Sequence, residues 1–194
     1  MIETTEINKE LKDRFIEELK NTGRPNWELL VKAMEEGGFF TSPCSGKHHL
    51  SEPGGLLIHS LNVLNYARKL NETFGKPVKD DSIVITALLH DLGKMGDHGK
   101  PNYKEKLLKS GERSEAEPYI TNKDLAYIDH EIRSVMIAER YIPLTEEEEQ
   151  AILFHNGLYS LFKYEIQGKE TPLYLIIHFS DMWCSRVVEE KEDK

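Results

Sequence analysis

The chain has 194 residues, and its 25 basic against 34 acidic side chains give a net charge of −9. This length suffices for one well-buried core and no Pro-, Gly- or Ser-rich linker divides it, so we expect a single domain, residues 1–194. The acidic balance argues against a surface that neutralises many phosphates along a long nucleic acid. No apolar run is long enough to span a membrane, and the first residues lack the basic-then-apolar order of a signal peptide. The two cysteines, Cys44 and Cys184, do not have the spacing of a disulfide framework, which fits a reducing compartment. We therefore expect a cytoplasmic protein without a membrane partner.

Residues 1–38 are predicted to form a pair of helices ahead of the core. Apolar residues between Ile7 and Leu19 recur on one stripe among charges, which is typical of an amphipathic helix. A second stripe runs from Trp27 to Glu36 and stops at Gly37-Gly38, because glycine favours the end of a helix. We expect this pair to cap a core formed by residues 39–190.

An aperiodic stretch, residues 39–49, ends in the pair His48-His49 and is predicted to be a loop. It leads into a helix that runs to about Phe74, for which Ser51 is the expected capping residue. His59 lies in the apolar phase of this helix. Taken alone, such a histidine is more often a hydrogen-bonded core residue than a metal ligand.

The stretch from Asp81 to Lys94 carries the strongest chemical signal. Its apolar positions have helical spacing, and His90 and Asp91 each lie three and seven residues after apolar positions, on the inward face of the predicted helix. An unpaired carboxylate in a dry core costs on the order of several kcal/mol, so an inward Asp is normally ion-paired, hydrogen-bonded or bound to a metal. The adjacent imidazole favours a metal.

Residues 97–127 have weak periodicity and many Gly, Pro and charged positions. Such a segment is either a lid-like insertion near a site or plain disorder, and the sequence favours neither. A short hairpin around Ser110-Gly111 is a further alternative for part of the segment. A helix then resumes with Asp129 as its expected N-cap and His130 in its first turn. Its apolar stripe is predicted to run from Ile132 to Met136.

Two further helices each place a polar residue on an apolar stripe. The first begins with a capping box, Thr145 to Glu148, and has His155 on its apolar face. The second runs from about Pro172 to Glu190, and Asp181 interrupts its stripe. We interpret the segment from Glu189 to Lys194 as a solvated tail.

Four histidines and two aspartates therefore lie mostly in the buried phase of separate helices. For any one of them a hydrogen-bonded core role is the simpler interpretation. Lys and Arg are nearly absent from these stripes, so the two aspartates lack obvious salt-bridge partners, and the six side chains suffice to ligate two divalent ions. The candidate ligands are His59, His90, Asp91, His130, His155 and Asp181.

With these residues the sequence resembles the HD-domain metal-dependent phosphohydrolases, an all-α family, from about Phe39 to Arg186. The resemblance rests on the ordered motifs Gly-Gly-Leu-Leu-Ile-His59, Leu-Leu-His90-Asp91-Leu-Gly-Lys94, His130, Phe-His155-Asn-Gly and His178-Phe-Ser-Asp181. It implies a single HD-type helical bundle. The His48-His49 loop is similar to that of phage-type HD hydrolases and of the HD half of 3′→5′ exoribonucleases. Two positions depart from the pattern: Asp129, where relatives commonly have Gly, and Asn156, where the exoribonucleases have a second His.

By position, the resemblance implies two ions that share Asp91 as a bridging ligand. The first ion would be held by His59, His90, Asp91 and Asp181, and the second by Asp91, His130 and His155. The implied cofactors are divalent transition metals, namely Mn, Fe, Co, Ni or Zn, with Mg as an alternative in the second site.

The implied reaction is hydrolysis of a small nucleotide-like phosphomonoester or phosphodiester by a metal-bound hydroxide. Asp91 would be catalytic as the metal bridge. Lys94 is suited to both catalysis and substrate binding as a point charge for a phosphoryl oxygen, and His49 is a candidate to contact the substrate or protonate a leaving group. Each also has a plain structural interpretation, Lys94 as a cation favoured at a helix C-terminus and His49 as a loop residue without a role.

Two other classes of function stay open. Some HD-domain members use the same ligands at a di-iron site that oxygenates a small polyol or phosphonate, and a non-catalytic nucleotide-sensing module is a third class. Oxygen uptake with Fe(II) but no phosphate release with Mn(II) would select the oxygenase. Tight ligand binding without turnover would select the sensor.

Overall fold

The computed structural model describes residues 2–160 and 163–190, and these residues are mainly helical, which confirms the predicted all-α class. The α-helices are α1 (Ile2–Asn21), α2 (Trp27–Gly37), α3 (Gly55–Thr73), α4 (Asp80–Leu89), α5 (His130–Ala138), α6 (Glu146–Phe154) and α7 (Pro172–Trp183). Short 3₁₀ helices are η1 (Phe39–Thr41), η2 (Leu92–Met95) and η3 (Gly157–Tyr159), and η4 (Cys184–Val188) is a π-helical turn.

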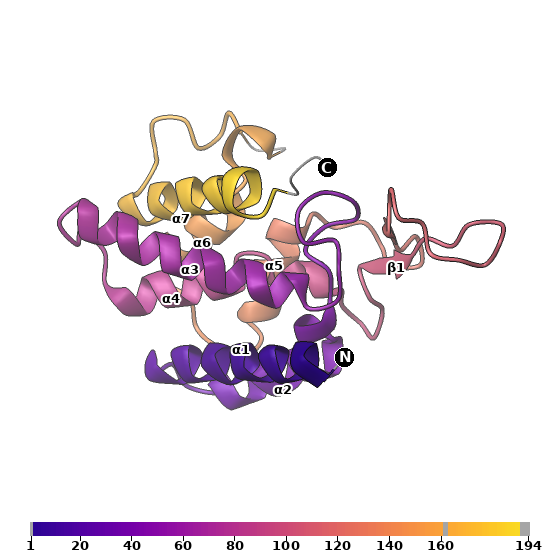
Figure 1. Ribbon diagram of the computed structural model, residues 1–194. Coiled ribbons are helices and arrows are strands. Elements are labelled where there is room, and N and C mark those ends of the chain that lie inside the picture. Colours follow the sequence, from indigo (N-terminus) through magenta and orange to yellow (C-terminus); the bar gives the residue numbers. More distant parts are fainter. Residues whose placement is uncertain (1, 161–162, 191–194) are drawn as a thin grey trace.

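The helix α3 is central to the bundle. It packs against α4 and α7, and α6 packs against both α7 and α5 (Figure 1). The predicted N-terminal pair is present, with α1 against α3 and α4, and α2 beside α1. Its stripes face the core as expected, because Phe15, Leu19, Leu30 and Met34 are fully buried. The pair therefore caps one side of the helices that hold the candidate ligands.

Local chain chemistry explains two of the helix ends. Gly38 follows α2 in a left-handed conformation (φ 77°), in which glycine avoids the strain that a side chain would cause. At the start of α6 the predicted capping box is formed: the Glu148 N–H donates to Thr145 Oγ1 at 3.3 Å, and the Thr145 N–H donates to Glu148 Oε2 at 2.9 Å.

The expected cap of α3 is wrong. Gly54 takes the N-cap position of this helix with φ 81°, and the Ser51 side chain does not reach it. Ser51 Oγ instead donates to the His48 carbonyl oxygen at 3.0 Å and lies 2.9 Å from Ser45 Oγ. Ser51 therefore closes the loop that carries the two histidines rather than starting the helix.

Residues 97–127 form an extended hairpin that projects from the bundle (Figure 1). Its strands β1 (Tyr103–Glu105) and β2 (Tyr119–Thr121) pair antiparallel, with Tyr103 opposite Thr121. Farther out, Leu107 and Arg113 form an isolated bridge around the turn predicted at Ser110-Gly111. This small sheet is an addition to the all-α bundle among the described residues.

The predicted stripe of α5 is also wrong. Met136 is exposed, whereas Glu131, Arg133, Ser134 and Ile137 are buried. The helix thus turns polar residues inward. Polar residues on an inward face give no apolar period, so the sequence pattern selected the wrong face.

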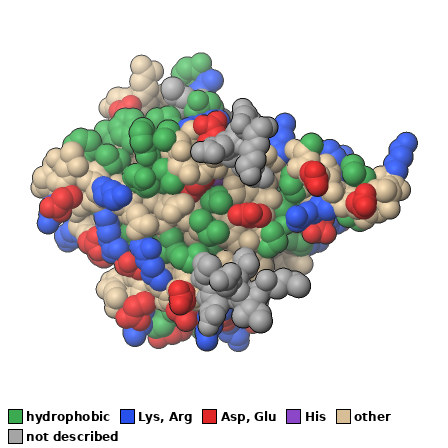
Figure 2. Space-filling model, in the orientation of Figure 1, with side chains coloured by type: hydrophobic (Ala, Val, Ile, Leu, Met, Phe, Trp, Pro, Cys, Tyr) green, Lys and Arg blue, Asp and Glu red, His purple; other side chains and the backbone are tan. Residues whose placement is uncertain are grey.

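Exposed hydrophobic side chains gather over α7 and the neighbouring part of α3 (Figure 2). They line an apolar groove of about 590 Å³ that includes Tyr66, Leu70, Phe179, Met182, Trp183 and Val187. Among the described residues, no helix combines the length and the apolar character that a bilayer span requires.

Candidate metal centre

The centre is built where α4 ends. The helix predicted to continue to Lys94 stops at Leu89, His90 takes the C-cap position, and Asp91 leaves the helical conformation with φ −103° and ψ 12° before η2 begins. Because the chain tightens here, the two side chains point to one place: His90 Nε2 lies 3.3 Å from Asp91 Oδ2. Both side chains are buried, as predicted.

Gly93 allows α5 to approach this turn. A Cβ atom at this position would collide with the His130 carbonyl oxygen, and the Gly93 N–H donates to Ser134 Oγ at 2.8 Å. The close approach places His130, the first residue of α5, beside the end of α4. The Leu-Gly part of the motif is thus a packing requirement of the centre.

The four residues predicted to hold the first ion come together. His59 is on α3, His90 and Asp91 follow α4, and Asp181 is on α7. His59 Nε2 lies 3.0 Å from Asp181 Oδ1, 3.2 Å from His90 Nε2 and 3.6 Å from Asp91 Oδ2. Ligand atoms of a single ion have separations of this size, about 3–3.5 Å for bonds near 2 Å.

The pair predicted for the second ion lies on the other side of Asp91. His130 Nε2 is 3.2 Å and His155 Nε2 is 3.4 Å from Asp91 Oδ1. The oxygen atoms of Asp91 are thus divided, with Oδ2 toward His59 and His90, and Oδ1 toward His130 and His155. In each of these two groups, one ligand atom per residue lies within 4.8 Å of the others. A carboxylate that bridges two ions divides its oxygen atoms in this way.

Three of the rings are oriented by their other nitrogen atom. In each ring the Nδ1–H donates to a fixed acceptor, so the Nε2 lone pair is left to face the centre. The pairs are His59 with Glu189 Oε2 at 2.8 Å, His90 with the Ala87 carbonyl oxygen at 2.9 Å, and His155 with the Ile152 carbonyl oxygen at 2.8 Å.

Glu189 is a site residue that the sequence analysis missed. It was assigned to a solvated tail, but it is buried, and besides His59 it accepts a hydrogen bond from Asn62 Nδ2 at 2.8 Å. The π-helical turn η4 brings the chain back toward α3 and so carries Glu189 inward. Its charged neighbours gave no sequence signal for burial. Residues 191–194 of the predicted tail lie outside the described residues.

Asp91 also has a cationic partner that the stripes did not reveal. Lys94 Nζ lies 2.7 Å from Asp91 Oδ2, so the expectation of an aspartate without a salt bridge is wrong for this oxygen. Oδ1 is different, because it is buried and, among the described residues, has no hydrogen-bond partner. Burial would raise the pKa of Asp91, but Lys94 and His90 outweigh it and hold the pKa well below its usual range.

The residues present therefore fit divalent cations. A buried, ionised carboxylate with one unpaired oxygen atom is costly, and the groups around that oxygen are imidazoles, which ligate metals in their neutral form. On the Oδ2 side, burial lowers the pKa of His90, which favours that neutral form. On the Oδ1 side, burial would lower the pKa of His155, but the Asp91 carboxylate outweighs it and raises that pKa. Burial would also lower the pKa of His59, but the neighbouring Cys44 and the hydrogen bonds to Asp181 and Glu189 raise it well above its usual value. Metal binding at His59 would then release a proton.

Two cavities reach the centre. One of about 220 Å³ is lined by Lys94, Asp181 and His49, together with His48, Asn156, Tyr159, His178, Met182, Ser185 and Arg186. Another of about 830 Å³ lies between the hairpin insertion and His130, with Tyr103 and Arg133 in its wall. Lys94 and His49 are thus both at a cavity beside the candidate ligands.

The sequence matches one family model. The HD domain model matches residues 56–178, which is more than half of the chain. The match includes His59, His90, Asp91, His130 and His155 and ends before Asp181, so the place of Asp181 rests on the geometry. Comparisons with curated proteins and with solved structures gave no match. The matched segment and its clustered ligands show that the chain belongs to the HD-domain family, within a superfamily of metal-dependent hydrolases.

Proposed function

We propose that the protein is a metal-dependent phosphohydrolase that acts on a small nucleotide-like phosphomonoester or phosphodiester. The observation that carries this proposal is the division of the two Asp91 oxygen atoms between two pairs of histidines. The first ion would be held by His59, His90, Asp91 and Asp181, and the second by Asp91, His130 and His155. Bound divalent ions supply Lewis acidity for phosphoryl charge and lower the pKa of a water nucleophile.

Lys94 is our candidate for binding a phosphoryl oxygen. Its ammonium group lies 2.7 Å from Asp91 Oδ2 and borders the 220 Å³ cavity, so a phosphoryl group at the centre would lie within its reach. This position supports a role in the site over the plain helix-end interpretation. Arg186 lines the same cavity and adds a cationic group that attracts an anion.

His49 contributes to the cavity wall rather than acting as a proton donor. Its Nε2 lies 3.3 Å from Cys44 Sγ, and its side chain is mostly buried. Burial, together with the neighbouring His59 and Lys94, lowers the pKa of His49 to about 4. A ring that is neutral at physiological pH is poorly suited to protonate a leaving group.

Three observations support a compact substrate. The net charge is −9, and the cavity that borders Lys94 and Asp181 has a volume of only about 220 Å³, although the cavity beside His130 is larger at about 830 Å³. On the face shown in Figure 2, Lys and Arg side chains are interspersed with Asp and Glu rather than forming a continuous stripe. A processive nuclease holds a long strand with an extended basic groove or a stacking platform, and the acidic net charge and mixed surface charges favour a compact substrate over such a strand.

The test is a hydrolysis panel with the Mn(II)-loaded protein. Nucleoside phosphates, cyclic nucleotides, short oligonucleotides and long RNA are compared by phosphate release and product analysis. We expect turnover of the small phosphoesters and a loss of about 10–100-fold, not complete loss, in Lys94→Ala, since one charged contact is removed.

Other outcomes would contradict the proposal. A strong preference for long RNA that disappears with modest salt would contradict the substrate class. Oxygen uptake with Fe(II) but no phosphate release with Mn(II) would replace hydrolysis by oxygenation. Tight nucleotide binding without turnover would indicate a sensor.

A further inference from the structure

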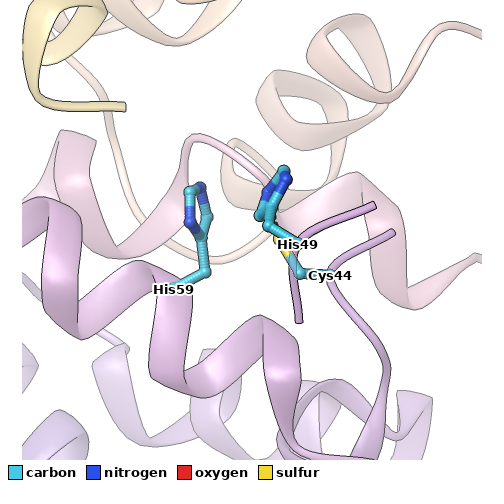
Figure 3. Close-up of side chains that lie close together, drawn as sticks. All are labelled: Cys44, His49 and His59. Carbon is cyan, nitrogen blue, oxygen red and sulfur yellow. Dashed lines mark hydrogen bonds between the residues drawn. The ribbon is translucent and has the colours of Figure 1, made fainter. Parts of the chain in front are cut away.

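A buried cysteine lies at the edge of the candidate centre. Cys44 is on the loop between η1 and α3, and its Sγ lies 3.3 Å from His49 Nε2, 3.9 Å from Asp91 Oδ2 and 4.0 Å from Lys94 Nζ. Figure 3 shows the Cys44 and His49 side chains close together, with the His59 ring next to them on α3. The sulfur atom thus faces an imidazole, a carboxylate and an ammonium group.

We propose that Cys44 and His49 are additional metal ligands, which join His59 and make this end of the centre a site for a thiophilic divalent cation such as Zn(II), Co(II) or Fe(II). This inference rests on the proposed metal centre and adds two ligands to the six side chains already assigned. It also gives His49 a role that differs from substrate protonation.

The second cysteine of the chain, Cys184, also lies within electrostatic range of His59, Glu189 and Asp181, but it packs differently. Cys184 is fully buried and belongs to the hydrophobic core cluster, and no candidate ligand group among the described residues contains it. Cys44 is equally buried but lies outside that cluster and inside a ligand group. Buried structural cysteines usually behave as small hydrophobic side chains, and Cys44 differs from them because its sulfur atom contacts polar and charged groups rather than the apolar cluster.

The spacing of the three side chains fits one ion. One ligand atom each from Cys44, His49 and His59 lies within 4.8 Å of the others. At bond lengths of about 2.3 Å to sulfur and 2.1 Å to nitrogen, neighbouring sulfur and nitrogen ligands of one ion are roughly 3–3.6 Å apart. The measured 3.3 Å between Cys44 Sγ and His49 Nε2 lies within this range. Thiolate and imidazole together select Zn, Co or Fe over Mg and Mn.

The loop holds the two side chains facing each other before any ion binds. The Cys44 N–H donates to the Leu50 carbonyl oxygen at 3.1 Å, and Ser45 Oγ donates to the His49 carbonyl oxygen at 2.8 Å. The hairpin braces the same loop, because the Tyr119 N–H donates to the Gly46 carbonyl oxygen at 3.1 Å. Ligands fixed in this way lose little conformational freedom on binding.

Binding would exchange a proton for the ion. Burial raises the pKa of the Cys44 thiol to about 11, so it is protonated at neutral pH in the absence of an ion. A divalent cation deprotonates a coordinating thiol. The S–H bond breaks, the S–metal bond forms, and the proton leaves to solvent.

The test is a titration of the metal-free protein with Co(II), followed by absorption spectroscopy. A thiolate-to-cobalt charge-transfer band is expected in the near ultraviolet, together with the visible d–d bands of bound cobalt. Cys44→Ser should lose the charge-transfer band while still binding cobalt through the other ligands, and Cys184→Ser, the matched control, should keep it. His49→Gln should keep the band and bind cobalt at least about 10-fold more weakly.

X-ray absorption of the Zn(II)-loaded wild-type protein provides a measurement that needs no variant. A sulfur scatterer in the zinc coordination shell supports the inference. A shell of nitrogen and oxygen only, or bound cobalt without the charge-transfer band, overturns it and leaves the HD metal centre standing. Absence of cobalt binding in the wild-type protein overturns both the inference and the proposed function.

Discussion

Two buried carboxylates, Glu148 and Asp91, have opposite surroundings. Glu148 on α6 is fully buried, and both of its oxygen atoms are paired: Oε1 with Arg24 Nη2 at 2.5 Å, and Oε2 with the Thr145 N–H at 2.9 Å. Asp91 is equally buried, but only Oδ2 has a cationic partner, Lys94. Its Oδ1 faces two imidazoles without a hydrogen bond among the described residues.

The difference teaches that burial alone does not mark a functional carboxylate. The ion pair of Glu148 joins the turn after α1 to the start of α6, which is a structural task. In the part of the chain that the structure describes, the buried side-chain oxygen atoms without a hydrogen bond are Asp91 Oδ1 and Glu131 Oε2, and both lie beside His130. Buried acceptors gathered among imidazoles are the donor set that a divalent cation prefers, and the Arg24–Glu148 pair offers no such set.

The largest expected effect comes from Asp91→Ala. Removal of the proposed bridge should lower kcat/KM for the best small substrate by about 10³-fold or more, since the ions contribute several kcal/mol to transition-state stabilisation. Glu148→Gln, which removes the charge of the other carboxylate, should leave kcat/KM unchanged while the protein stays folded. Hydrolysis rates are measured together with circular dichroism, because an empty metal site can also unfold helices. Unchanged activity in a folded Asp91→Ala variant would show the mechanism to be wrong.

The structural carboxylate gives the second prediction. Arg24→Ala leaves Glu148 buried without its cation and should lower the free energy of unfolding by about 3–5 kcal/mol. Urea denaturation of the metal-free protein measures this loss. In the double variant with Glu148→Gln part of the stability should return, because no uncompensated charge remains. A loss below about 1 kcal/mol would place this pair with exposed salt bridges instead.

Glu189→Gln tests the ring orientation of His59. Gln keeps the size of the side chain but offers a neutral, weaker acceptor to Nδ1, so we expect metal affinity to fall about 10–100-fold. Isothermal titration with Co(II) or Mn(II) measures the affinity. Glu190→Gln, which changes the neighbouring exposed carboxylate, is the matched control and should have no effect. Equal affinities in the two variants would remove Glu189 from the centre.

The smallest effect is expected at a partly solvated carboxylate, Asp97, at the base of the hairpin. Arg140 donates to both of its oxygen atoms at 2.9 and 2.7 Å and lowers the pKa of Asp97 to about 2. Because the folded pKa lies below the usual 3.8, the pair stabilises the folded state fully above that value and loses its effect as the pH falls through 2. Asp97→Asn should therefore cost about 1 kcal/mol at neutral pH and less at pH 2. Denaturation curves at both pH values check this; a cost independent of pH would contradict it.

Much of the fold follows from information carried by neighbouring residues. The apolar stripes of α1 and α2, the glycine that ends α2 and the capping box of α6 all depend on contacts within a few residues, and the structure contains each of them. The ordered HD motifs identified the family before any geometry was known, and the family match confirms it. The roles of the individual site residues stay predictions.

Two details near the centre could not be predicted from the sequence, because they depend on how separate helices pack against each other. The sequence predicted an inward His90-Asp91 pair, but the helix end that turns both side chains to one point depends on the approach of α5 over Gly93. Likewise, α5 turns Glu131 inward against its own apolar pattern.

The sequence by itself determined most of the helices, because periodicity and caps are local, and the order of its motifs along the chain identified the family and the six candidate ligands. Only the tertiary structure showed that Glu189 and Cys44 lie at the same centre as these ligands. Glu189 reaches His59 across 130 positions of the chain, and Cys44 meets Asp91 across 47. Such contacts depend on how separate helices and loops pack, and residues so far apart leave no periodic signal in the sequence.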